Sequence, residues 1–255
     1  MNPVIYERLH SNLLGLKLNT VEQLLDNCLE LAARDGTTTI EVLDHLFEQE
    51  RKHREAAAIE RRTRFAVFPV RKTLQEFDLE FQPSIERRGI EDLATLRFVH
   101  NAENVVLLGP PGVGKTHLAI ALGMESTKAG FSVYFINAGC LIERLKKANR
   151  EGVLEKKLRD LTRYKLLIID EMDYLPFDEE GAHCFFQLIS KRYEKSSIIF
   201  TSNKSYGRWG EIFQDNVIAS AVLDRILHHC TTINIKGESY RLKDRRKLGL
   251  QSGKL

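Results

Sequence analysis

The amino-acid sequence predicts an α/β fold, in which a doubly wound, parallel, five-stranded sheet follows a small all-α region at the N-terminus. Five short runs of apolar residues lie between residues 104 and 236, and stretches of helical character separate them. Runs that are apolar throughout suit parallel strands covered on both faces. Strands that alternate with helices favour a sheet with helices on both sides. Hydrophobic residues make up 43% of the 255, which is sufficient for a core of this size.

The patterns up to about residue 65 are helical only. Thr20 and Gln23 fit a capping box at the start of one helix, which Asp35-Gly36 ends. Thr38 and Glu41 fit a second capping box. The helix after it is expected to turn three apolar side chains inward: Leu43, Leu46 and Phe47.

The same pass along the chain predicts its organisation. We expect a helical N-terminal domain over residues 1–68, a linker over 69–103, and an α/β domain over 104–255 that ends in a basic tail. The five predicted strands cover residues 104–108, 132–138, 165–170, 197–203 and 231–236.

Composition and charge exclude some classes of protein. The longest uninterrupted apolar run is Leu118–Leu122, whereas a membrane-spanning helix needs roughly 18 apolar residues. The N-terminus lacks the basic segment and apolar stretch of a secretion signal. We therefore expect a cytoplasmic protein. The 38 basic and 35 acidic residues give a net charge of +3, so only local clusters could indicate nucleic-acid binding.

The four cysteines do not form a disulfide framework or a metal-ligand pattern. Cys28, Cys140, Cys184 and Cys230 are far apart in the sequence and are expected to be reduced thiols. The clusters His183-Cys184 and His228-His229-Cys230 suggest a metal site at first sight. Adjacent residues on a helix point in different directions, however, so we interpret both clusters as packing or surface residues.

The clearest chemical motif is GPPGVGKT, which occupies Gly109–Thr116 and matches the pattern G-x-x-x-x-G-K-T. It lies between an apolar strand and a helix, where glycines let backbone N–H groups turn toward phosphate oxygens. Lys115 would reach the β- and γ-phosphates of ATP, and Thr116 would bind Mg²⁺. The residues expected to contact the nucleotide are Gly109, Pro110, Pro111, Gly112, Val113, Gly114, Lys115, Thr116 and His117.

Polar residues end two further apolar runs. Asp170 and Glu171 lie at the carboxyl end of a predicted strand, where ligands bind to open parallel sheets. Asp170 is expected to hold Mg²⁺ through water, and Glu171 to accept a proton from the attacking water or to orient it. The run at 198–203 ends in Asn203. Its amide could bind that water or the γ-phosphate, although a turn-forming Asn is the default interpretation.

With these motifs in this order, the sequence resembles an AAA+ ATPase. More narrowly, it resembles the IstB-like helper ATPases of bacterial transposons, and the DnaC-type replicative helicase loaders are similar too. The resemblance extends from about Thr73 to Arg241 and implies a P-loop AAA+ fold for the α/β domain. The segments that carry it are GPPGVGKTHLAIALG, LLIIDEMDYLP, FFQLISKRYE, IIFTSN, AVLDRILHHC and GESYR.

The resemblance implies roles for three polar residues. Asn203 matches the polar residue of sensor 1. Arg225, in LDR, matches the arginine finger, which reaches the γ-phosphate in a neighbouring subunit. Arg241, in GESYR, matches the sensor 2 arginine, which acts on the nucleotide of its own subunit. Without the resemblance, both arginines would be interpreted as surface residues paired with Asp224 or Glu238.

The chain departs from the resemblance at one position close to these residues. Many relatives carry a small residue where Met172-Asp173 stand. Asp173 could join the outer shell of Mg²⁺ or face solvent, and we favour the second interpretation.

The resemblance also implies a function. An ATP-bound homo-oligomer would grip double-stranded DNA, mark a target site, and recruit and stimulate the transposase, and ATP hydrolysis would release it. The alternative is a replicative helicase loader of the DnaC type. A small-molecule kinase is a third possibility, against which Asp170-Glu171 and Arg225 speak. A fourth is a structural oligomer that never hydrolyses nucleotide.

The expected DNA contacts lie in the basic segment at 141–160. The candidates are Lys146, Lys147, Arg150, Lys156 and Lys157. Glutamates interleave with them, so the segment equally fits a charged amphipathic helix. The basic cluster Arg51–Arg64 and the C-terminal tail from Arg241 are further candidates. No sequence-reading motif is present, so contacts should be mainly to phosphates.

Overall fold

The structure of the protein is a computed structural model that describes residues 3–173, 176–240 and 242. The chain divides into two compact units, Met1–Arg61 and Arg62–Leu255. The first unit contains α1 (Pro3–Gly15), α2 (Asn19–Asp35) and most of α3 (Thr39–Phe65), whose last residues belong to the second unit.

The core of the first unit is small. Five apolar side chains are buried in it: Leu13, Val21, Leu25, Val42 and Leu46. The inner face expected for α3 is therefore only partly right, because Leu43 and Phe47 are 47% and 51% exposed. Val42 takes the inward position instead, since it lies one turn before Leu46 on the same side of the helix.

The starts of α2 and α3 are capped in different ways. At α3 the predicted capping box is present: the Thr38 N–H donates to Glu41 Oε2 at 2.8 Å, and the Glu41 N–H to Thr38 Oγ1 at 3.4 Å. The box predicted at Thr20 is wrong. The N–H groups of Thr20 and Val21 donate to Glu50 Oε2 on α3 instead. A tertiary contact thus satisfies the helix start in place of a local side chain.

The second unit is built on a parallel five-stranded sheet, as predicted. Its strand order is β2-β3-β4-β1-β5. The three central strands are buried along almost their whole length, which explains why their sequences are apolar throughout. The strands are β1 (Asn104–Leu108), β2 (Val133–Asn137), β3 (Leu166–Asp170), β4 (Ser197–Ser202) and β5 (Cys230–Asn234).

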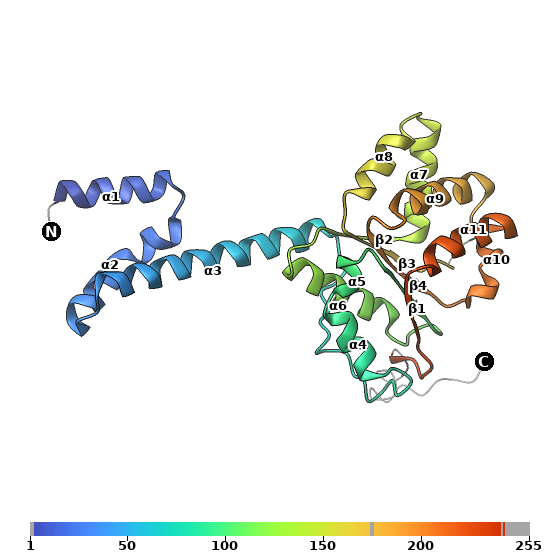
Figure 1. Ribbon diagram of the computed structural model, residues 1–255, viewed down its shortest axis with the longest axis horizontal. Coiled ribbons are helices and arrows are strands. Elements are labelled where there is room, and N and C mark those ends of the chain that lie inside the picture. Colours follow the sequence, from blue (N-terminus) through green and yellow to red (C-terminus); the bar gives the residue numbers. More distant parts are fainter. Residues whose placement is uncertain (1–2, 174–175, 241, 243–255) are drawn as a thin grey trace. The chain divides into compact units, whose positions relative to one another are not determined.

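Helices cover both faces of this sheet (Figure 1). One face, which includes Leu107 and Ile168, packs against α4 (Arg87–Ala94), α5 (Arg97–His100) and α6 (Lys115–Lys128). The other face includes Val106 and Ile169. It packs against α7 (Ala138–Arg150), α8 (Leu154–Thr162), α9 (Glu179–Arg192), α10 (Gly210–Phe213) and α11 (Asn216–Leu227), and a 3-10 turn, η1 (Tyr206–Arg208), precedes α10.

The carboxyl ends of the parallel strands gather the predicted motifs. Because β3, β4 and β1 are neighbours and run in the same direction, their ends meet at one edge of the sheet. The phosphate loop follows β1, Asp170-Glu171 ends β3, and Asn203 follows β4. Within the described ranges, no helix has the length and apolar character to cross a membrane.

Candidate functional site

The loop between β1 and α6 holds the Gly109–Thr116 motif, and its backbone requires glycine. Gly109 and Gly114 have φ angles of 149° and 101°, a region that L side chains rarely adopt. A Cβ atom at Gly109 would lie 2.3 Å from the carbonyl oxygen of Ile235, and one at Gly114 would lie 2.5 Å from the Phe77 ring. The chain therefore turns tightly into α6, whose N-terminal N–H groups and dipole attract anions.

The Lys115 side chain lies against this loop and is only 8% exposed. Its Nζ donates to the carbonyl oxygens of Gly109 and Pro110, at 2.7 Å and 2.8 Å, and to Asn203 Oδ1 at 2.8 Å. All three acceptors are neutral. A charged phosphate oxygen could replace any of them with a gain in electrostatic attraction.

Asp170 lies between two threonine hydroxyls. Its Oδ1 accepts hydrogen bonds from Thr116 Oγ1 at 2.9 Å and from Thr201 Oγ1 at 2.6 Å. Burial raises the pKa of the Asp170 carboxyl, although the hydrogen bonds from Thr201 and Thr116 and the charge of Lys115 oppose that shift. Carboxylate and hydroxyl oxygens are the ligands that Mg²⁺ prefers, so Thr116 and Asp170 form a donor set that fits this ion.

Glu171 follows directly but has different surroundings. Its φ of 57° lies in the left-handed region, which is uncommon for residues other than glycine. Its N–H donates to Thr201 Oγ1 at 2.9 Å, and its Oε2 accepts from Asn137 Nδ2 at 2.7 Å. Asn137 was not among the residues predicted from the sequence. The signal was available, because Asn137 ends an apolar run just as Asn203 follows one.

Asn203 is held by Asp173. Asp173 Oδ1 accepts from the Asn203 backbone N–H at 2.8 Å, and Oδ2 accepts from Asn203 Nδ2 at 2.9 Å. Asp173 stays partly exposed to solvent, and its carboxylate is in addition engaged by two N–H donors of Asn203. These contacts also orient the amide, because Nδ2 faces Asp173 while Oδ1 faces Lys115.

These groups surround a cavity of about 480 Å³, which is within the size range of small-molecule sites. Eight of the predicted site residues line it: Pro111, Gly112, Gly114, Lys115, Thr116, His117, Glu171 and Asn203. Gly109, Pro110, Val113 and Asp170 are not among its lining residues. Val113 is fully buried in the core, and Gly109 packs against Ile235, so these two residues support the loop from behind.

One wall of the cavity comes from the segment interpreted as a linker. Phe77 and four neighbours between Val70 and Asp78 line it, together with Tyr240. His117 Nε2 lies 2.9 Å from the Thr73 carbonyl oxygen, and its ring meets Phe77 edge to face. Burial lowers the pKa of His117, which favours the neutral ring. Aromatic side chains at one side and the phosphate loop at the other fit a nucleotide.

Of the two arginines predicted to act on the nucleotide, only Arg225 lies within the described residues. Arg225 on α11 does not line the cavity of its own chain. Its Nη1 donates to the Ala221 carbonyl at 2.8 Å, and its guanidinium lies 4.8 Å from the centre of the Phe186 ring. Arg241 lies outside the described residues, directly after Tyr240, as does most of the basic tail.

Two of the basic residues expected to bind DNA are paired with acidic residues at the start of α9. Lys146 Nζ lies 2.6 Å from Asp178 Oδ2, and Arg150 Nη2 lies 2.9 Å from Glu180 Oε2. The Asp178 carboxylate raises the pKa of Lys146, so the ammonium stays charged but is matched by an anion. The paired residues join α7 to α9.

The remaining basic candidates are more open. Lys147 is 76% exposed and lies 3.9 Å from Glu151. Lys156 and Lys157, on α8, form no ion pair within the part of the chain that the structure describes. In the Arg51–Arg64 cluster of the sequence, Arg51 pairs with Glu48 and Glu55 one turn away.

Comparison with known proteins shows the family to which the chain belongs. Residues 11–248 match the family of IstB-like ATP binding proteins. Over 235 residues the chain is 49% identical to a protein of insertion sequence IS21 from Pseudomonas aeruginosa that is described as ATP-binding; the match covers 92% of this chain and 89% of that one.

Two solved structures share the fold of the second unit. The replication initiator DnaA, bound to AMPPCP and single-stranded DNA, matches with a TM-score of 0.55 and 18% identity over 74% of this chain and 58% of that one. DnaI matches with a TM-score of 0.55 and 22% identity over 65% and 92% of the two chains. The chain therefore has a P-loop AAA+ fold, binds ATP, and belongs to the family of IstB-like ATP binding proteins.

Proposed function

We propose that this protein hydrolyses ATP and, in its ATP-bound form, acts as the DNA-binding helper of a transposase. The observation that carries the proposal is the convergence of the phosphate loop, the Glu171 carboxylate and the Asn203 amide on one cavity, with Asp170 behind them. The relative from insertion sequence IS21 supports a role in transposition, because its name ties it to a mobile element.

Hydrolysis requires a water molecule to attack the γ-phosphorus while the bond to the bridging oxygen of the β-phosphate breaks. Glu171 accepts the proton from this water, since its carboxylate lines the cavity and Asn137 holds it in place. Lys115 and the start of α6 bind the phosphates, and Asn203 bonds to the γ-phosphate or the water. Thr116 and Asp170 would hold Mg²⁺, which would supply positive charge to the phosphate oxygens.

Assembly completes the site. Arg225 lies away from the cavity of its own chain and acts on the ATP of a neighbouring subunit. Arg241 acts on the nucleotide of its own subunit. A residue supplied by a neighbour makes hydrolysis depend on a homo-oligomer, and such an arginine typically contributes about 10³ to 10⁵ in rate.

The ATP-bound oligomer grips double-stranded DNA through the basic residues of α7 and α8. The contacts are mainly to phosphates, so they depend on salt and only weakly on sequence. The complex recruits and stimulates the transposase of the same element, and hydrolysis releases the DNA.

Glu171→Gln tests the catalytic part. The amide fills the same space but cannot take a proton, so nucleotide affinity should stay while phosphate release falls by about 10² to 10⁴. The variant should also remain on DNA with ATP, measured by co-sedimentation. Glu179→Gln, at an exposed position at the start of α9, is the matched control. Phosphate release near the wild-type rate in Glu171→Gln would remove Glu171 from the mechanism.

The transposition part needs a separate test. The purified transposase of the same insertion element is supplied with target DNA, with and without this protein and ATP. We expect strand transfer to rise only when both are present. No stimulation by an ATPase-active preparation would contradict the helper role while leaving the hydrolysis proposal intact.

A further inference from the structure

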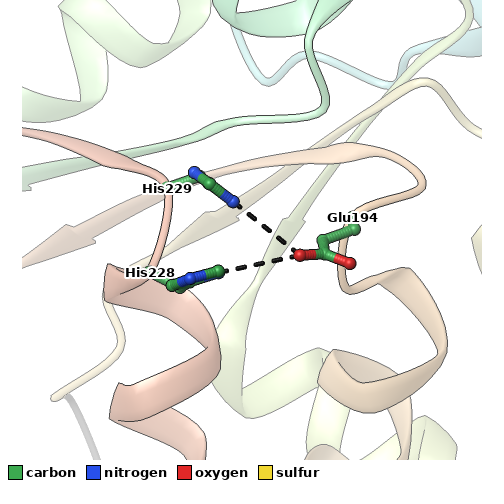
Figure 2. A group of neighbouring side chains, drawn as sticks. All are labelled: Glu194, His228 and His229. Atoms are coloured by element: carbon green, nitrogen blue, oxygen red, sulfur yellow. Dashed lines mark ion pairs between the residues drawn. The ribbon is translucent and has the colours of Figure 1, made fainter.

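The turns after α9 and α11 bring three side chains of metal-binding type together. Glu194 follows α9, and His228 and His229 follow the last residue of α11. Each offers one ligand atom, and these atoms all lie within 4.8 Å of one another (Figure 2). None of the three lines the nucleotide cavity, so this cluster has no part in the site described above.

The two histidines converge although they are neighbours in the sequence. The expectation that the two rings diverge as neighbours on a helix is wrong, whereas the interpretation of both histidines as surface residues agrees with their exposure. α11 ends at Leu227, so His228 is its C-cap and His229 belongs to the turn into β5. The chain changes direction there, and both rings face the Glu194 carboxylate (Figure 2).

Backbone contacts hold both turns in place. The N–H of Asn104, at the start of β1, donates to the His229 carbonyl at 2.8 Å. On the other side, the N–H groups of Lys195 and Ser196 donate to the Arg192 carbonyl at 2.9 Å and 3.2 Å and close the turn that contains Glu194. Glu194 has a φ of 57°, a backbone conformation that is costly for residues other than glycine. The fold therefore presents the three ligands together.

The distances leave room for a small ion. Glu194 Oε1 lies 3.7 Å from His228 Nδ1 and 3.7 Å from His229 Nε2. Both separations are too long for a direct hydrogen bond. Two ligand atoms that each bind zinc at about 2.0–2.1 Å in tetrahedral geometry are roughly 3.3 Å apart. Glu194 Oε1 would thus approach each histidine nitrogen by a few tenths of an ångström on binding an ion, and all three ligand atoms already lie within 4.8 Å of one another.

The ligand set selects the class of metal. Two imidazoles and one carboxylate suit zinc, cobalt and nickel, whereas calcium and magnesium favour oxygen ligands. The side chains of Glu194, His228 and His229 are 54%, 54% and 53% exposed, so water can reach the remaining coordination positions. The Tyr193 hydroxyl bonds to His228 Nδ1 at 2.8 Å, and this contact gives way when Nδ1 binds metal.

We propose that Glu194, His228 and His229 form a binding site for one divalent transition-metal ion of the zinc class, with water as the remaining ligands. The bound ion ties the end of α9 to the end of α11, the helix that carries Arg225.

The test titrates untagged full-length protein, without nucleotide, with Zn²⁺ in competition with a chromogenic chelator. We expect one equivalent to bind, and His229→Ala and Glu194→Gln each to weaken binding about tenfold or more, because loss of a ligand costs at least as much as loss of its supporting contact. His183→Ala is the matched control, since His183 is an exposed histidine on α9 outside the cluster. It should bind like wild type.

Thermal unfolding provides a second readout. Metal-free melting should be the same in all variants, because the substituted side chains are exposed. Saturating zinc should raise the melting temperature of wild type and His183→Ala but not of His229→Ala, since only the folded site binds the ion. Zinc affinity in wild type no higher than in His229→Ala would overturn the proposal. An equal loss of affinity in His183→Ala would overturn it too.

Discussion

Two regions of the second unit carry basic side chains, and they hold them in opposite ways. At the cavity, Lys115 donates to neutral oxygens of the loop and of Asn203. On the surface that α7 shares with α9, Lys146 and Arg150 donate to the carboxylates of Asp178 and Glu180. An anionic ligand that replaces a neutral acceptor gains the attraction of the cation, whereas one that replaces a carboxylate exchanges one anion for another. The cavity is thus prepared for phosphate, and much of the α7 charge is already matched.

Arg225 extends this comparison to α11, since it too is held by a neutral carbonyl and an aromatic ring. Arg225→Ala should lower hydrolysis by about 10³ to 10⁵ and leave the nucleotide affinity of isolated subunits intact. Mixing these subunits with Lys115→Ala subunits should restore activity, because one supplies the pocket and the other the arginine. The ATPase rate is measured against mixing ratio at fixed total protein.

Mixed oligomers must be shown to form in that experiment. If they form and the rate never exceeds that of either pure variant, Arg225 does not act between subunits and is a structural residue of α11.

Lys115→Ala should lower ATP affinity by about 100-fold, because the loss of one hydrogen bond between charged groups costs roughly 1.5–3 kcal/mol. Lys146→Ala is the matched control, since it removes a lysine whose partner is Asp178. Fluorescent-nucleotide titration measures both. Equal losses in the two variants would show that the Lys115 cation has no particular part in ATP binding.

Asp173→Ala tests whether the orientation of Asn203 matters. Without the two bonds from Asn203, the amide can turn, so kcat should fall by up to about tenfold, while ATP affinity changes little. Asp173→Asn keeps one acceptor oxygen and should recover part of the rate. A change in KM alone, with kcat unchanged, would show that Asp173 maintains the shape of its loop and does not position the Asn203 amide for catalysis.

The smallest effect is expected in DNA binding. The double substitution Lys156→Ala and Lys157→Ala should reduce the slope of log affinity against log salt concentration by about 2, because each lost phosphate contact reduces that slope by about 1. Lys146→Ala with Arg150→Ala should change the slope less, because both residues are paired with acidic residues of α9. The slope comes from affinities measured over a range of salt concentrations. A larger change of slope in the Lys146→Ala, Arg150→Ala variant than in the Lys156→Ala, Lys157→Ala variant would contradict this prediction.

Features with a local cause could be predicted from the sequence. β3 and β4 are buried on both faces, so their residue types alone indicate parallel strands. The backbone conformation of the phosphate loop itself requires glycine, so the motif can be recognised in the sequence without knowledge of its tertiary contacts.

Features that depend on distant partners could not be predicted. Glu50 caps α2 from 30 residues away, and Asp173 reaches Asn203 across 30 residues. The polar residues at strand ends could be found in the sequence. Their partners could not, because these depend on the strand order, which places β2 beside β3 and β3 beside β4. The wall around Phe77 was missed for the same reason, since only the folded chain brings that segment to the loop.

A single amide connects the two regions compared at the outset. Asn137 Nδ2 donates to Glu171, while its Oδ1 accepts from the Gly139 N–H in the first turn of α7. The side chain is short, so it cannot lengthen to keep both bonds if α7 moves relative to β3. A displacement of the basic helix would therefore also displace Glu171, the residue proposed to accept the proton, so that a load on the outer charge of the molecule could alter the timing of the proposed hydrolysis.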